Sequence, residues 1–167
     1  MRIIYTFVTA FMLAAALPHM ARAGSPEAYV PGLGEFMAAI QMRHAKLWFA
    51  GRAKNWELAA YELDELKEAF ADTAKYQPDF KGKPIAELIG QMTNEPMASL
   101  AKAIAAKDAP GFVKMMHRLS ASCTSCHQST GYGFILIQRP TSPPVTNQRF
   151  DLRSNPELRE LTSQQRP

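Results

Sequence analysis

The sequence predicts an all-α protein folded as an up-down four-helix bundle. Four segments carry apolar residues at steps of three and four, which is the spacing of a helix with one buried face. Short turns separate the segments, and no run alternates apolar and polar residues over the length of a sheet strand. Helices joined by short turns pack as antiparallel neighbours, and such bundles can hold a cofactor between facing helices.

The first two segments have clear apolar faces. The seam of segment 32–51 recurs at alternating steps of four and three: Leu33, Met37, Ile40, His44, Leu47 and Gly51. We expect Gly51 to end this helix. Asn55 then suits the N-cap of a second helix over 56–76, because its side-chain oxygen can accept from the first free N–H groups of that helix.

The third and fourth segments differ in where their prolines lie. A turn over 77–84 leads into the third segment, which contains Pro96. Proline is tolerated in the first turn of a helix but not in its interior, so we expect the third helix to be broken or to begin late. The fourth helix is expected to start after Asp108 as N-cap, with Pro110 in its first turn, and to run through 128.

The N-terminus has the pattern of a secretory signal peptide. An apolar run over 3–17 follows a short basic start and is too short to span a bilayer, and "ARA" at 21–23 is a typical cleavage site. We expect residues 1–23 to be removed, which places the mature chain in an oxidising compartment, most simply a bacterial periplasm. No membrane span is expected after cleavage.

Charge and composition limit the classes of partner that we expect the protein to bind. The formal charge of +4 becomes +2 once Arg2 and Arg22 leave with the signal peptide. The sequence has no basic stripe interleaved with aromatic residues, which makes nucleic acid an unexpected partner. We assign 24–138 to one helical domain. The remainder, 139–167, is rich in proline, and we expect it to be a disordered tail except where it lies on the domain.

Both cysteines of the chain lie in one short motif on the fourth helix. Cys123 and Cys126 are three residues apart, and His127 follows directly, so one helical turn carries all three side chains on nearly the same side. C-x-x-C-H is the attachment signal for c-type haem, in which each sulfur bonds a vinyl group and the histidine binds iron as the proximal ligand. The motif predicts one covalently bound haem c.

Two other readings of the motif are weaker. Thioredoxin-like disulfide sites follow a strand, whereas a helix precedes Cys123 here. A structural zinc site needs four protein ligands, and only His44 and His117 remain to complete the motif, at a spacing that matches no common zinc pattern. Neither reading explains why His127 is adjacent to Cys126.

The first helix offers candidates for the other face of the iron. His44 and Met37 share its seam because they are seven residues apart, whereas Met42 lies off that seam. Side chains tilt toward the N-terminus of their own helix, so His44 should reach toward His127 while Met37 points toward the rim. We expect His44 as the distal ligand and Met37 as the alternative, with an open or weakly blocked iron as the remaining possibility.

The stretch "DAPGFVKMMHRLSASCTSCHQ" resembles the last helix of the class II c-type cytochromes, the cytochrome c prime group of four-helix bundles. The resemblance covers about 33 to 130, and only the final helix is specific. It implies that Cys123 and Cys126 hold the haem, that His127 is its proximal ligand and that the first helix covers the opposite face. Family members place Met or an apolar residue over that face, giving electron carriers or gas-binding proteins respectively. This chain departs from the pattern in His44, in the short "GRAKN" turn and in the tail.

Together these features predict a periplasmic monohaem c-type cytochrome that carries single electrons between redox partner proteins and is not an enzyme. The alternatives are a five-coordinate haem protein that binds nitric oxide, and an accessory haem subunit of a larger oxidoreductase that docks through 139–167.

Overall fold

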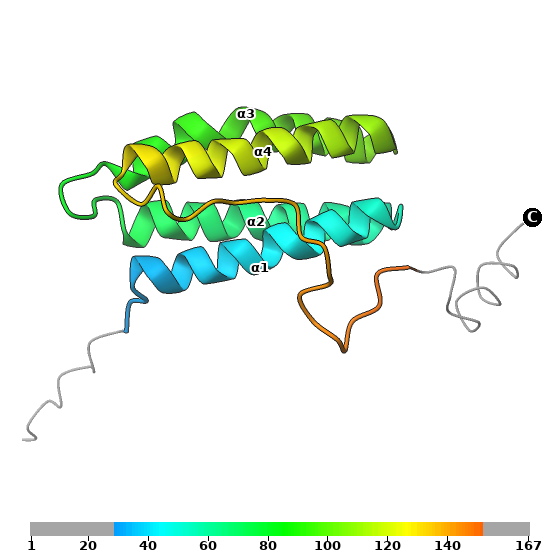
Figure 1. Cartoon of the computed structure of the whole chain (residues 1–167), viewed down its shortest axis with the longest axis horizontal. Coiled ribbons are helices and arrows are strands. Elements are labelled where there is room, and N and C mark those ends of the chain that lie inside the picture. Colours follow the sequence, from blue (N-terminus) through cyan, green and yellow to red (C-terminus); the bar gives the residue numbers. More distant parts are fainter. Residues whose placement is uncertain (1–28, 152–167) are drawn as a thin grey trace, which may run out of the picture.

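The computed structural model describes residues 29–151 as four helices packed against one another (Figure 1). The helices are α1 (Leu33–Arg52), α2 (Trp56–Tyr76), α3 (Ile85–Ala105) and α4 (Ala109–Ser129). Consecutive helices run in opposite directions, so the predicted all-α, up-down arrangement is confirmed. The predicted signal peptide, 1–23, and the end of the predicted tail, 152–167, lie outside the described residues.

The same three-residue pattern joins α1 to α2 and α3 to α4. Ala53-Lys54-Asn55 and Ala106-Lys107-Asp108 each place the lysine at positive φ, 58° and 54°. The residue after each lysine donates its N–H back into the finished helix, to Ala50 O and Ala103 O at 2.9 Å. That residue then caps the next helix. Asn55 accepts from Leu58 N at 3.2 Å and Asp108 from Gly111 N at 3.0 Å, which confirms both predicted N-caps.

Gly51 does not end α1, which continues to Arg52. Instead Gly51 is a contact point between α1 and α4: a side chain at this position would overlap the ring of Phe112. Phe112 is fully buried and lies between the rings of Trp48 and Trp56, with centroids 6.5 and 6.1 Å away. The glycine therefore allows the helices to approach around a buried aromatic cluster.

The core is apolar, with one charged group inside it. Its fully buried members come from every helix: Leu47, Leu63, Leu66, Leu100, Phe112, Met116 and Leu119. Glu62 of α2 is only 1% exposed, and two cations of α1 face it, with Arg43 Nη1 at 3.3 Å and Lys46 Nζ at 3.8 Å from its carboxylate oxygens. A buried carboxylate needs such partners, so these contacts fix how α1 and α2 are aligned.

The expectation of a broken or late third helix is wrong. Helix α3 runs without interruption from Ile85 to Ala105, with Pro96 inside it. Proline leaves one carbonyl of the preceding turn without its usual donor. Burial on both sides of the proline compensates, because Ile89, Met97 and Leu100 pack into the core from the same helix. Tertiary packing supplies most of the stability of a helix, and here it outweighs the local preference.

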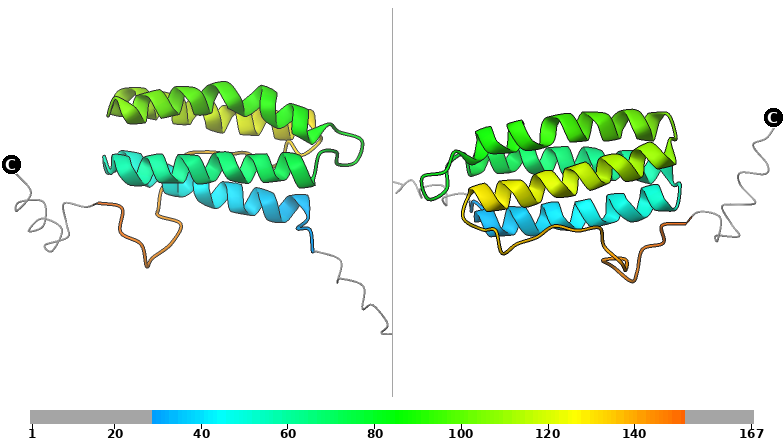
Figure 2. Two further views of the ribbon diagram at one scale, coloured as in Figure 1. Left: turned by 180° about the vertical axis from the view of Figure 1, so that it is seen from behind. Right: turned by 45° about the horizontal axis from the view of Figure 1, so that its top comes forward.

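The chain after α4 turns back and lies along the bundle (Figure 2). It runs beside α4 and α1, and neither helix nor strand forms in 131–137. Ile137 N donates to Thr124 Oγ1 at 3.0 Å, which ties the returning segment to α4. Further on, Phe150 is buried against Phe49, and its carbonyl accepts from Asn55 Nδ2 at 3.3 Å. The described part of the predicted tail thus lies on the helical domain.

Among the described helices, none combines the length and apolarity needed to cross a lipid bilayer.

Candidate functional site

The three residues of the C-x-x-C-H motif lie in the last two turns of α4. Cys123, Cys126 and His127 are half-buried, and all three line one cavity of about 440 Å³. The size is within the range of about 300–1,000 Å³ typical of ligand sites. Side chains from all four helices form the walls, most of them aliphatic or aromatic, such as Ile40, Leu66, Phe70, Ile89 and Leu119. An apolar cofactor of moderate size matches such a lining.

The returning segment orients His127. Its Nδ1 lies 3.0 Å from the carbonyl oxygen of Ile135, and because a carbonyl can only accept, Nδ1 carries the proton. Two backbone bonds hold that carbonyl in place: Ile135 N donates to Tyr132 O at 2.9 Å, and Tyr132 N donates to His127 O at 2.7 Å. The lone pair of Nε2 is then available to a metal. Such a hydrogen bond to the other ring nitrogen is the usual support of a ligating histidine.

His44 of α1 lines the same cavity and is 5% exposed. Its Nε2 is 2.9 Å from Ser120 Oγ, and Ser120 in turn donates to Met116 O at 2.9 Å. The serine has one proton to give, so His44 Nε2 is the donor of the pair and Nδ1 is unprotonated. Burial lowers the pKa of His44 to about 4. The imidazole is therefore neutral at neutral pH.

The structure brings every predicted site residue to one cavity. Met37 of α1 also lines it, as does His44. That Met37 points toward the rim stays a prediction. The contact of His44 with Ser120, which lies seven residues before His127, places it about 10 Å along α4 from His127, at 1.5 Å per residue. His44 as ligand and Met37 as its alternative both stay predictions. Exposed His117 is not part of the cavity.

Several lining residues were not identified from the sequence. Met92 of α3 faces the cavity as a further thioether. Its place about two turns after Ile85 on the apolar stripe of α3 was a usable signal, which the expected break at Pro96 obscured. Lys81 and Lys83, from the turn between α2 and α3, also line the cavity together with Tyr132. No sequence periodicity marks residues that reach a site from a turn.

Both thiols have raised pKa values. Burial raises the pKa of Cys123 to about 12, with a further contribution from Cys126, and burial also raises the pKa of Cys126. Neither sulfur is bonded to the other. Across residues 29–151, no three side chains of histidine, cysteine, aspartate or glutamate are grouped as a metal ion would require. The site consists of two thiols and two imidazoles that line an apolar cavity.

Comparisons of the chain with protein-family models, with curated proteins and with solved structures find no significant match.

Proposed function

We propose that this protein is a monohaem c-type cytochrome that carries single electrons between redox partner proteins. One observation supports the proposal most strongly: both thiols of the motif, His127 and His44 line the same apolar cavity. The sequence motif concerns only one helical turn. The cavity adds a largely apolar space next to that turn, with a second imidazole, that of His44, in its lining.

The residues present fit a covalently held haem. Cys123 and Cys126 would retain it through thioether bonds, and His127 would bind the iron through Nε2 while Nδ1–H stays on Ile135 O. Haem in such a site supplies a metal that takes up and releases one electron. The protein then needs no substrate chemistry. Its residues hold the cofactor, exclude water from most of its surface and set the reduction potential through the axial ligands.

The competing chemistries of C-x-x-C have less support. Disulfide exchange requires a thiolate at neutral pH, and burial raises the pKa of both thiols here. A structural zinc site requires four ligands within reach of one ion, and within the described part of the chain no three side chains of histidine, cysteine, aspartate or glutamate are grouped in that way.

For the sixth position we propose His44, with Met37 as the alternative. His44 is neutral at neutral pH, and its ring lines the same cavity as the motif. A second imidazole would give a lower potential than a methionine, since thioether ligation raises it. The competing function is a five-coordinate haem protein that binds nitric oxide, in which His44 stays hydrogen-bonded to Ser120 and leaves the iron open.

Optical spectra of the oxidised and reduced protein test these proposals. The chain is produced in a host that attaches haem c, as the wild type and as His44→Ala, Met37→Ala and His117→Ala variants. We expect a six-coordinate low-spin spectrum that becomes high-spin in His44→Ala and does not change in His117→Ala, the exposed control. A high-spin wild type would instead favour gas binding, and colourless protein would contradict the proposed function altogether.

Export to a bacterial periplasm is part of the proposal, because haem attachment to such motifs accompanies a signal peptide of the kind predicted over 1–23. The role of an accessory subunit has weaker support. The described part of the tail, 139–151, contacts its own domain through Phe150, so it is engaged within the molecule.

A further inference from the structure

Lysine side chains give the mouth of the cavity a positive charge that no acidic side chain of its lining balances. Lys81 and Lys83 line the cavity, and none of its described lining residues is an aspartate or a glutamate. The rest of the lining is mostly apolar. A cavity with an apolar interior and cations at one edge is complementary to an amphiphilic ligand that ends in anionic groups.

The two lysines lie on a rigid turn. Phe80 N donates to Lys83 O, and Lys83 N donates to Phe80 O, both at 3.0 Å. Lys81 and Gly82 between them have positive φ of 49° and 75°, the backbone of a two-residue hairpin turn. This fixed hairpin, residues 80–83, extends from the end of the bundle where α4 finishes (Figure 1).

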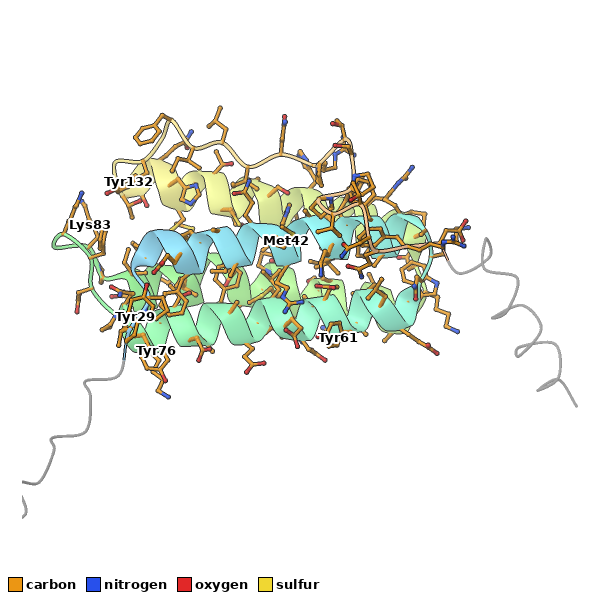
Figure 3. All side chains as sticks on the ribbon, turned by 90° about the horizontal axis from the view of Figure 1, so that it is seen from below. Tyr29, Met42, Tyr61, Tyr76, Lys83 and Tyr132 are labelled. Carbon is orange, nitrogen blue, oxygen red and sulfur yellow. The ribbon has the colours of Figure 1, made fainter. Side chains whose placement is uncertain are left out.

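Lys81 is held toward the haem-motif end of α4. Its Nζ is 3.1 Å from the hydroxyl of Tyr132 and lies over two aromatic rings, 5.2 Å from the centroid of Phe80 and 5.7 Å from that of Tyr132. Tyr132 is bonded through its backbone to His127. Figure 3 shows Lys83 and Tyr132 at this same end of the molecule. Lys81 is thus connected to the predicted proximal ligand through Tyr132, and Lys83 lines the same cavity.

We propose that Lys81 and Lys83 bind the propionate carboxylates of the haem. The inference rests on the proposed function and identifies which residues recognise the polar edge of the cofactor. Haem is a flat apolar ring with two carboxylates, and two ammonium groups at the mouth of an acid-free cavity supply the opposite charge. The thioether bonds hold the ring, and the hairpin pairs with its anionic groups.

The test compares the reduction potential of holoprotein variants as a function of pH. The Lys81→Gln/Lys83→Gln double variant removes the proposed pair and keeps a hydrogen-bond donor at each position. The Lys102→Gln/Lys114→Gln double variant is the matched control, because both lysines are exposed and neither lines the cavity. Lys81→Arg/Lys83→Arg retains the charges.

Lysines beside the carboxylates keep them ionised, so their removal should raise the carboxylate pKa by about one unit. In the Lys81/Lys83 glutamine variant, we expect the pH range over which the potential changes to lie about one pH unit higher than in the wild type. The potential at neutral pH should also fall, because positive charge near the iron favours the reduced state. The control should shift far less, and the arginine variant should match the wild type.

A profile of the Lys81/Lys83 glutamine variant that superimposes on that of the control would overturn the inference while leaving the cytochrome proposal intact. Wild-type protein without any haem would instead contradict the proposed function, and with it this assignment. The presence of haem in the wild type therefore separates the two failures.

Discussion

His44 is a polar side chain whose state is fixed by burial and by one hydrogen bond. Its Nε2–H donates to Ser120, whose own proton is committed to Met116 O. No group in this chain of bonds accepts a hydrogen bond from a second N–H of the ring. Protonation would therefore place an uncompensated charge in the core, which is why the pKa of His44 lies near 4.

This depressed pKa makes the stability of the haem-free chain depend on pH. Below about pH 6.5 the unfolded chain protonates His44, while the folded protein resists protonation until about pH 4, so stability falls as pH decreases through this window. We expect a loss of about 2 kcal/mol through this group between about pH 7 and pH 4.5. Urea unfolding at the two pH values measures it.

The control for this measurement is His44→Gln, which keeps an N–H donor for Ser120 but does not titrate. Its free energy of unfolding should change less over the same interval, by the amount that His44 contributes. Equal pH dependence in both proteins would show that His44 is not buried as a neutral imidazole.

At the scale of the helix, the sequence was sufficient to predict those features that depend on contacts between residues close together in the chain. Asn55 and Asp108 cap α2 and α4 as predicted, because capping involves only the next three residues. The errors arose where distant residues decide. Pro96 is accommodated by core packing of α3, and Gly51 is explained by Phe112, sixty-one positions later in the chain.

Replacing Gly51 or Gly90 by alanine should change the stability of the protein in opposite directions, because only Gly51 lies at the close contact of α1 and α4. Gly51→Ala should destabilise the protein by about 1–3 kcal/mol, because the new methyl group overlaps the enclosed ring of Phe112. Gly90→Ala is the matched control: the nearest atom to its added carbon is Asn94 Nδ2, 3.6 Å away. It should stabilise α3 by about 0.5–1 kcal/mol through helix propensity.

Chemical denaturation of both variants measures the two effects under one set of conditions. A stabilised Gly51→Ala protein would mean that α1 and α4 do not approach each other as the structure has them. A destabilised Gly90→Ala protein would mean that the space beside Gly90 is occupied by another group.

At the scale of the whole molecule, the candidate site is assembled from parts that differ in how far sequence can predict them. Cys123, Cys126 and His127 are neighbours on one helix, so their common face followed from helical geometry alone. That His44 shares their cavity required the packing of α1 beside α4. The carbonyl that orients His127 and the hairpin that brings Lys81 come from non-periodic segments, for which the sequence carries no repeat to interpret.

The segment after α4 links these levels, since it supports His127 at one end and ends in a core contact at the other. Phe150 is 8% exposed, packs on Phe49 and bonds Asn55, which also caps α2. We expect Phe150→Ala to cost about 3 kcal/mol of stability, the usual range for a buried phenylalanine. Phe134 lies on the same segment but is 79% exposed, so Phe134→Ala should cost almost nothing.

Thermal or urea unfolding compares the two alanine variants, and hydrogen exchange of the Ile137 amide reports on the segment itself. If 131–151 acts as one strap, the amide bonded to Thr124 should exchange faster in Phe150→Ala than in Phe134→Ala. Unchanged exchange with reduced stability would mean that Phe150 anchors only the end of the strap. His127 would then depend on the local bonds of Tyr132 and Ile135 alone, and its orientation would be independent of the tail.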